Sequence, residues 1–318
     1  MDRFDVVVAK RTYEAEGIVS LALTKPDGRD LPVWEPGAHL DVTLPSGLIR
    51  QYSLCGDPSV RSEYRIAVLR EVESRGGSLE VHEGLSVGTK LSILGPRNHF
   101  PVVAAARYLF IAGGIGITPI LPMISQLTAN SVPWRLVYGG RRKLSMAFLE
   151  EILAIPDGDV VVAPEDEAGL LDIARELKSL TSETVVYCCG PEGLLRAVED
   201  NCERMGISQR LHLERFGANS RLPAPDAGGI EGFDVHLAKA NITLTVPADR
   251  SLLSVIREAL PQVPFSCEEG SCGTCETEVL EGVPDHRDQV LSEAEREDGK
   301  TMMICVGRSL TPRIVLNL

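Results

Sequence analysis

Cys267-Glu268-Glu269-Gly270-Ser271-Cys272-Gly273-Thr274-Cys275 is the stretch around which this 318-residue chain is organised. It holds three thiols at the spacing C-x4-C-x2-C, and Cys305 supplies a fourth thiol thirty residues later. Four thiolates at this spacing are a ligand set for a [2Fe–2S] cluster, and the small Gly and Ser residues let the backbone fold closely around it. We therefore predict that Cys267, Cys272, Cys275 and Cys305 ligate such a cluster.

Disulfides and structural zinc are the alternatives for these cysteines. Disulfides are typical of secreted chains, whereas the N-terminal sequence Met1–Asp5 lacks the apolar segment of a signal peptide. A structural zinc site usually pairs one C-x2-C with a second such pair or with two histidines, and the sequence has neither. The remaining cysteines are expected to be buried thiols: Cys55, Cys188, Cys189 and Cys202.

Length, charge and hydropathy limit what the chain can do. Its 318 residues suffice for two or three domains, and 44% apolar residues allow a sizeable core. The net charge of −13 argues against a nucleic-acid partner. Residues 233–318 hold 14 acidic against 8 basic residues, which could steer the chain towards a basic partner or simply keep it soluble. The sequence has no run of 18 apolar residues and no signal peptide, so we expect no membrane span and a cytoplasmic protein.

Residues 1–102 contain three segments in which apolar residues alternate with small or polar ones. This period-2 pattern, with frequent Gly and Pro between the segments, predicts the short strands of an antiparallel β-barrel. The alternating apolar residues are Leu21, Leu23, Leu40, Val42, Leu44, Tyr64, Ile66 and Val68.

Two short motifs in this region suit a flavin. Arg50-Gln51-Tyr52-Ser53-Leu54 offers a cation for a phosphate, an aromatic ring for stacking and a hydroxyl that can donate to flavin N5. Arg75-Gly76-Gly77-Ser78 precedes a helical turn, so its backbone N–H groups and the helix dipole form a phosphate cradle. Each motif, taken alone, also fits an ordinary strand or a flexible Gly-Gly turn.

Residues 103–216 alternate apolar runs with helical stretches, which predicts a doubly wound sheet of parallel strands. The predicted strands are 107–112, 134–138, 159–163, 184–188 and 210–214. The predicted helices are 119–129, 145–153, 170–179 and 191–205.

Glycine-containing turns follow three of these strands. Gly113-Gly114-Ile115-Gly116-Ile117-Thr118-Pro119 joins the first strand to a helix, with Thr118 as the expected N-cap and Pro119 at the first helical position. Tyr138–Arg141 and Cys189–Gly193 follow the second and fourth strands. The glycine spacing in Gly113–Pro119 differs from the G-x-G-x-x-G of the standard dinucleotide fold. Ligands of open α/β sheets bind at the carboxyl ends of the strands, where all three turns lie. We expect a pyridine nucleotide at this edge.

The choice between NADH and NADPH depends on charge near the adenosine ribose. The third strand is followed by Glu165-Asp166-Glu167, which would repel a 2′-phosphate or hydrogen-bond a ribose hydroxyl. Arg141-Arg142-Lys143 after the second strand is evidence for NADPH, because these cations suit a 2′-phosphate as well as a pyrophosphate. The acidic segment leads us to predict NADH.

The C-terminal part begins after a Pro- and Gly-rich linker at 217–232. It predicts a hairpin of strands 233–238 and 242–246, a helix at 251–260, and a strand at 276–281. Ser292-x-x-Glu295 predicts a capped short helix. Strands at 302–306, carrying Cys305, and at 313–318 complete the predicted domain.

Together these motifs resemble the ferredoxin-reductase superfamily, in the branch of the phthalate dioxygenase reductases. The motifs that carry the resemblance are R-x-Y-S-L, R-G-G-S, G-G-x-G-x-T-P, Cys-Gly-Pro, the segment Gly95–Pro101 and the plant-type ferredoxin cysteines. The resemblance covers the whole chain. It implies an FMN-binding domain at 1–102, an NAD-binding domain at 103–216, a linker at 217–232 and a β-grasp [2Fe–2S] ferredoxin domain at 233–318.

The same resemblance implies site residues. The flavin, expected to be FMN, would be contacted by Arg50, Tyr52, Ser53, Val68, Leu69, Arg70, Gly76, Gly77 and Ser78. The nucleotide would be contacted by Gly113, Gly114, Gly116, Thr118, Gly139, Arg141, Glu165, Asp166, Cys189, Gly190 and Pro191. Ser53, Thr118, Cys189 and Phe216 are the predicted catalytic residues. Phe216 would lie over the flavin and yield to the nicotinamide, although it also suits a core position at a domain edge.

The predicted function is the transfer of electrons from NADH through FMN to the cluster. The resemblance implies that the acceptor is the Rieske-type terminal oxygenase of an aromatic-ring dioxygenase or O-demethylase. We expect a monomer, with Glu268 and Glu269 either docking the partner or serving as solvated loop charges. The alternatives are a donor to a cytochrome P450 or another haem protein, a stand-alone NADH-dependent reductase, and a redox sensor. The intact Cys-Gly-Pro turn argues against a sensor.

Overall fold

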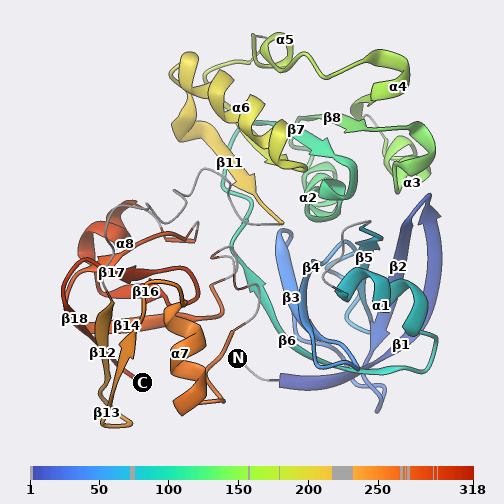
Figure 1. The fold of residues 1–318 in the computed structure, drawn as a ribbon. Coiled ribbons are helices and arrows are strands. Elements are labelled where there is room, and N and C mark those ends of the chain that lie inside the picture. Colours follow the sequence, from blue (N-terminus) through green and yellow to red (C-terminus); the bar gives the residue numbers. More distant parts are fainter. Residues whose placement is uncertain are drawn as a thin grey trace. The chain divides into compact units, whose positions relative to one another are not determined.

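The structure is a computed structural model that describes residues 3–71, 76–156, 158–178, 180–216, 232–265, 268, 270, 273–288, 290–291 and 293–318. The chain divides into two compact units, Met1–Arg215 and Phe216–Leu318. The first unit holds an antiparallel and a parallel sheet, and the second holds a mixed sheet (Figure 1). None of the described helices is long and apolar enough to cross a membrane.

The first sheet is antiparallel and curls on itself, as the alternating pattern predicts. Its strands, in the order β4-β3-β6-β1-β2-β5, are β1 (Arg3–Ala15), β2 (Ile18–Thr24), β3 (Ala38–Thr43), β4 (Ile49–Ser53), β5 (Tyr64–Leu69) and β6 (Lys90–Asn98). A bridge between Leu54, directly after β4, and Ile66 in β5 brings the two outer strands together. The eight alternating apolar residues are buried in the core that this curvature encloses, and helix α1 (Gly77–Gly84) adds Val81 to it.

The second sheet is parallel and has helices on both faces, which confirms the doubly wound arrangement. Its strands, in the order β11-β10-β7-β8-β9, are β7 (Arg107–Gly113), β8 (Trp134–Gly140), β9 (Asp159–Pro164), β10 (Thr184–Cys189) and β11 (Leu211–Glu214). The helices are α2 (Ile117–Ala129), α3 (Leu149–Leu153), α4 (Glu165–Ala168), α5 (Ile173–Lys178) and α6 (Glu192–Arg204). Successive residues of β7 face opposite sides, since Phe110 and Ala112 pack with α2 while Leu109 and Ile111 pack with α5 and α6.

The two sheets of the first unit share one apolar core. Ile18, Cys55 and Ala67 of the curled sheet belong to the same buried cluster as Ile117 and Leu121 of α2. All five are less than one-tenth exposed. Side chains of the two sheets can therefore meet at fixed positions.

Several predicted boundaries differ from the structure. The predicted helix at 145–153 is a short 3-10 turn followed by α3, and the predicted helix at 170–179 is shortened to α5. Helix α4 was not predicted, because its four residues are too few to show a helical period. The predicted domain boundaries remain predictions.

The second unit shows the element order expected of a β-grasp domain. The sheet order is β13-β12-β18-β14-β16, with β12 (Phe233–Leu237), β13 (Ile242–Val246), β14 (Glu276–Glu281), β16 (Thr301–Met303) and β18 (Arg313–Leu316). Beside it lie a two-stranded ribbon and two helices, namely β15 (Pro284–Asp285), β17 (Arg308–Ser309), α7 (Leu252–Ala259) and α8 (Glu293–Asp298). Ser251 caps α7, since its Oγ accepts from Ser254 N at 3.1 Å. The predicted cap Ser292 lies outside the described residues.

A candidate electron-transfer site

The predicted nucleotide motifs meet at one edge of the parallel sheet. Gly113, Gly140, Pro164 and Cys189 end β7, β8, β9 and β10, and Glu214 ends β11. In chain order β7, β8 and β10 are the first, second and fourth strands of this sheet. In space β7 lies between β8 and β10. The winding direction therefore reverses between β7 and β10, which is where open α/β sheets bind ligands.

The Gly113–Gly116 turn and the Cys189–Pro191 turn are in backbone contact at this point. A Cβ on Gly116 would lie 2.2 Å from the carbonyl oxygen of Cys189, and one on Gly190 would lie 2.9 Å from the Cα of Gly113. A Cβ on Gly113 would lie 2.6 Å from Cδ of Pro191. Glycines are required here because the two turns approach more closely than any side chain allows, whereas Gly114 adopts a φ of 53° with open space beside it.

Thr118 was predicted as the N-cap of α2, and this was wrong. The helix begins at Ile117 after a 3-10 turn at Gly114–Gly116, with Gly116 at the N-cap, so the backbone is already helical before Thr118. The Thr118 hydroxyl donates to the Ile115 carbonyl at 2.9 Å and the residue is 2% exposed. Its contact with a nucleotide remains a prediction.

The residues that bear on the choice between NADH and NADPH follow β8 and β9 at the same edge. Arg141 follows β8, and Glu165 and Asp166 follow β9 in the first turn of α4. The Asp166 N–H donates to the Arg141 carbonyl at 3.3 Å, so the cationic and acidic segments are adjacent. The side chains of Arg141, Glu165 and Asp166 are exposed. Gly139 lets Leu171 approach, since an added Cβ would lie 2.9 Å from its Cδ1.

Glu214 is the residue on which the two halves of the site converge. Ser53, at the end of β4, donates from Oγ to Glu214 Oε2 at 3.4 Å. The Cys189 thiol donates to the same oxygen at 3.9 Å. Burial raises the pKa of Glu214 to about 8, while the hydrogen bonds from Ser53 and Cys189 act in the opposite direction. Burial, and then the charge of Glu214, raises the pKa of Cys189, so that Cys189 remains a thiol.

Glu214 was not among the predicted site residues. The signal available in the sequence was its position at the end of the last predicted strand, 210–214. In the structure this position is in register with Cys189, at the end of β10. Arg215 holds this strand end against α6, with Nε 3.3 Å from Glu192 Oε2 and Nη2 2.5 Å from Glu199 Oε2. Phe216 is the first residue of the second unit and is 48% exposed, so its place over the flavin remains a prediction.

The predicted phosphate cradle is formed by Arg50 and the start of α1. A Cβ on Gly77, the first residue of α1, would lie 2.5 Å from Arg50 Nε and 2.7 Å from Arg50 Cγ. The Arg50 side chain therefore lies in the space left by the missing side chain. Gly76 precedes the helix with a φ of 93°, and the Ser78 hydroxyl accepts from Glu71 N at 3.2 Å. A cation beside a helix N-terminus suits a phosphate group. Arg75 lies outside the described residues.

The other predicted flavin residues line the same end of the curled sheet or its core. Tyr52 is half-buried, and burial raises the pKa of its phenol well above the usual range, so the ring is neutral. The Val68 side chain is buried in the core, so only its backbone could contact a flavin. Its carbonyl oxygen lies 2.9 Å from His82 Nε2. Leu69 is half-buried, and Arg70 pairs with Glu83 at 2.5 Å.

Two of the four predicted cluster ligands are described, and both are buried. Cys275 precedes β14 and is 3% exposed, while Cys305 is 6% exposed. Cys305 was predicted within a strand, but it lies in the turn after β16 because that strand ends at Met303. The Ile304 N–H donates to the Cys275 carbonyl at 3.4 Å, so both thiols lie at neighbouring strand ends.

Gly270, between the predicted ligands Cys267 and Cys275, packs on Val306, directly after Cys305. Gly270 and Gly273 adopt φ values of 72° and 73°, and a Cβ on Gly270 would lie 2.6 Å from Val306 Cγ2. Buried thiols held by left-handed glycines fit a [2Fe–2S] cluster. The described residues contain no group of three or more metal-binding side chains, but they omit Cys267 and Cys272. Glu268 is exposed, 3.9 Å from Arg257, and Glu269 lies outside the described residues.

Two family models match the nucleotide region and the cluster region of the chain. Residues 235–309 match the 2Fe-2S iron-sulfur cluster binding domain, and residues 110–200 match the oxidoreductase NAD-binding domain. The chain is 41% identical to the vanillate O-demethylase oxidoreductase of Pseudomonas putida, over 99% of both chains.

The solved structures that are similar to the whole chain include a phthalate dioxygenase reductase and a cytochrome P450 monooxygenase. The phthalate dioxygenase reductase, described as a modular structure for electron transfer from pyridine nucleotides to [2Fe-2S], has a TM-score of 0.72 and 37% identity, covering 99% of this chain and 98% of that one. An intact type IV self-sufficient cytochrome P450 monooxygenase has a TM-score of 0.90 and 40% identity, covering 99% of this chain and 41% of that one. The protein therefore belongs to the phthalate dioxygenase reductase family of electron-transfer oxidoreductases, with the cofactors that the sequence predicts, namely FMN, NADH and a [2Fe–2S] cluster.

Proposed function

We propose that this chain is the reductase component of a Rieske-type aromatic-ring oxygenase or O-demethylase. It would take electrons from NADH through FMN to its [2Fe–2S] cluster and pass them to the oxygenase. The observation that carries the path from NADH to FMN is the convergence of Ser53 and Cys189 on Glu214, at 3.4 and 3.9 Å, and the names of the relatives support the oxygenase partner. Because the flavin motif and the nicotinamide motif each bring one side chain to the same carboxyl group, cofactors bound at the two motifs would meet there.

The chain's own task is to bind and orient the cofactors. NADH supplies a hydride and FMN passes its electrons on singly, so this chemistry resides in the cofactors. Arg50 and the N-terminus of α1 would hold the FMN phosphate. The turn at Gly113–Gly116 and the N-terminus of α2 would hold the pyrophosphate of NADH, and the Cys189–Pro191 turn would flank the nicotinamide. The exposed carboxylates of Glu165 and Asp166 would favour NADH over NADPH.

Glu214 would control the proton on Ser53. When neutral, the Glu214 carboxyl can donate a hydrogen bond to Ser53 Oγ. The Ser53 hydroxyl would then be free to donate its own hydrogen bond to a bound flavin. When ionised, it would accept the hydrogen bond from the Ser53 hydroxyl and would place a negative charge between the flavin motif and the nicotinamide motif. Since burial raises the pKa of Glu214 to about 8, the neutral form prevails at pH 7.

This role predicts a pH dependence. The rate of flavin reduction by saturating NADH should fall about tenfold between pH 7 and pH 9, as a single ionisation near pH 8 requires. Glu214→Gln cannot ionise and should give a flat profile in anaerobic stopped-flow measurements. Glu183→Gln, at an exposed position before β10, is the control and should keep the wild-type profile. An inflection near pH 8 that persists in Glu214→Gln would remove Glu214 from this role.

The phosphate cradle predicts a selective loss of FMN affinity. In Gly77→Ala the new Cβ displaces the Arg50 side chain, so the affinity of the apoprotein for FMN should fall by about tenfold. The affinity for riboflavin, which lacks the phosphate, should change little. Flavin fluorescence titration measures both affinities. Gly84→Ala, in the same helix, is the control because its Cβ would meet only Glu80 Cγ at 3.6 Å. Equal losses for FMN and riboflavin would place the phosphate elsewhere.

A second candidate partner is a cytochrome P450, which the likeness to the self-sufficient P450 monooxygenase favours. The two candidates are separated by supplying the reductase and NADH anaerobically with either a purified Rieske-type oxygenase component or a purified P450 haem protein. We expect the Rieske cluster to be reduced faster than the haem, and the opposite order would support the P450.

Flavin released by heating and identified by chromatography should be FMN.

A further inference from the structure

We propose that Arg65 is a positioning residue for hydride transfer, which rests on the proposed function above. It would fasten the segment Ser53–Cys55 of the curled sheet to helix α3 of the parallel sheet. In doing so it would set the distance between Ser53, on the flavin side, and Cys189, on the nicotinamide side.

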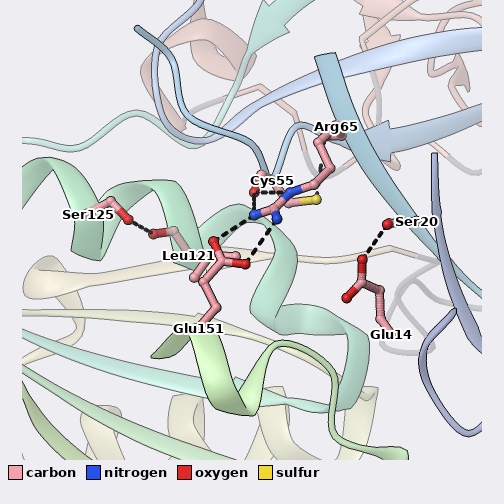
Figure 2. A network of polar contacts seen from close by, with 7 residues as sticks. All are labelled: Glu14, Ser20, Cys55, Arg65, Leu121, Ser125 and Glu151. Atoms are coloured by element: carbon pink, nitrogen blue, oxygen red, sulfur yellow. Dashed lines mark hydrogen bonds and ion pairs between the residues drawn. The ribbon is translucent and has the colours of Figure 1, made fainter. Parts of the chain in front are cut away.

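The Arg65 guanidinium bonds to both sheets at once. From β5, it donates from Nε and Nη2 to the carbonyl oxygen of Cys55, at 3.1 and 2.7 Å. Its Nη1 and Nη2 also donate to Oε2 and Oε1 of Glu151 in α3, at 3.0 and 2.8 Å. Figure 2 shows this guanidinium between Cys55 and Glu151. Such a planar, two-pronged arrangement is specific to arginine, since a lysine ammonium is a single point charge.

The two attached segments have little freedom to move independently. Cys55 is fully buried, and its N–H donates to the Arg65 carbonyl at 2.8 Å, so Arg65 holds Cys55 from both its backbone and its side chain. The guanidinium also lies 5.0 Å from the centre of the Phe148 ring, directly before α3. Phe148 adopts a φ of 61°, which is unfavourable for a bulky residue and indicates that tertiary contacts fix this turn.

The position of Cys55 determines that of Ser53. One residue, Leu54, separates Cys55 from Ser53, and the Leu54–Ile66 bridge fixes it against β5. Ser53 is 5% exposed and its Oγ is 3.4 Å from Glu214. A shift of α3 relative to β5 would therefore be carried to the Ser53 hydroxyl, and a displacement of about 1 Å can cost orders of magnitude in rate.

The first unit offers a matched control for this ion pair. Arg142 and Glu16 also join the two sheets, at 2.8 Å, but their side chains are 56% and 50% exposed. Arg65 is only 25% exposed and makes further bonds to the backbone. A pair whose two side chains are half exposed contributes little, so Glu16→Gln should leave the site unchanged.

The test compares Glu151→Gln, Arg65→Lys and Glu16→Gln with the wild-type holoprotein in anaerobic stopped-flow experiments over a range of NADH concentrations. Glu151→Gln and Arg65→Lys should lower the limiting rate of flavin reduction by about tenfold while changing the Kd for NADH less than twofold. They should also weaken the long-wavelength absorption of the nicotinamide–flavin complex. Glu16→Gln should match the wild type in all three measurements.

Hydrogen exchange provides a readout that does not depend on activity. The Cys55 amide should exchange faster in Glu151→Gln than in Glu16→Gln. Limiting rates that stay at the wild-type value in both Arg65 and Glu151 variants, or a loss confined to NADH affinity, would overturn the positioning role. If the wild type itself failed to reduce its flavin with NADH, the proposed function would fail instead, so the two failures are distinguishable.

Discussion

Gly116→Ala should reduce the rate of flavin reduction by NADH by roughly a hundredfold, because it forces apart the two turns that would hold the nicotinamide. The new Cβ would lie 2.2 Å from the Cys189 carbonyl oxygen, 2.4 Å from its carbonyl carbon and 2.7 Å from the Gly190 nitrogen. All three are backbone atoms, so no side chain can turn aside to make room. Cys189 would move away from Glu214 as a result.

Stopped-flow reduction and flavin content together measure this effect, since flavin content should stay at the wild-type level. Gly193→Ala is the matched control, because nothing lies within 4 Å of its added Cβ in α6. It should retain the wild-type rate. A wild-type rate in Gly116→Ala would show that the nicotinamide does not use this pair of turns.

Cys275→Ser should separate the two stages of electron transfer. Cys275 is 3% exposed, and a serine hydroxyl is a poor replacement for a thiolate ligand, so the variant should lose the cluster. Flavin reduction by NADH should remain close to wild type, whereas anaerobic cytochrome c reduction should fall by roughly a hundredfold, since electrons would leave through the cluster in the proposed order. Iron content and absorption spectra monitor the loss of the cluster.

Cys202→Ala is the control for removing a buried thiol. Cys202 is fully buried in α6, in the first unit, and its replacement should leave both chromophores and cytochrome c reduction intact. If Cys275→Ser lost its cluster and still reduced cytochrome c at the wild-type rate, electrons would leave from the flavin and the proposed order would be wrong.

Local patterns allowed much of the fold to be predicted from the sequence. The parallel strands β7, β8 and β10 were predicted because their apolar residues form largely buried runs, and the turns at Gly113 and Cys189 were predicted because each motif is short and continuous. The pairing of those turns could be expected only from the rule that ligands bind at the carboxyl edge of such sheets. Their close backbone contact became visible only in the structure, through Gly116 and the Cys189 carbonyl.

Contacts between distant segments could not be predicted in this way. Ser53 and Glu214 are 161 residues apart, and Arg65 and Glu151 are 86 residues apart. No periodicity links such positions, so Glu214 was missed although Ser53 and Cys189, which contact it, were predicted as site residues. The wrong prediction of Thr118 as the N-cap of α2 had a different cause. A threonine before a proline fits a capping position, but the 3-10 turn at Gly114–Gly116 leads into the helix before Thr118.

Anaerobic titration with NADH, followed at both chromophores, tests the central claim most directly. The purified protein should show flavin and [2Fe–2S] absorption together, and NADH should bleach both. In stopped-flow mode the flavin should be reduced first and the cluster afterwards. A protein that contained zinc in place of an iron chromophore, or a cluster that was reduced before the flavin, would contradict electron transfer from NADH through the flavin to the cluster.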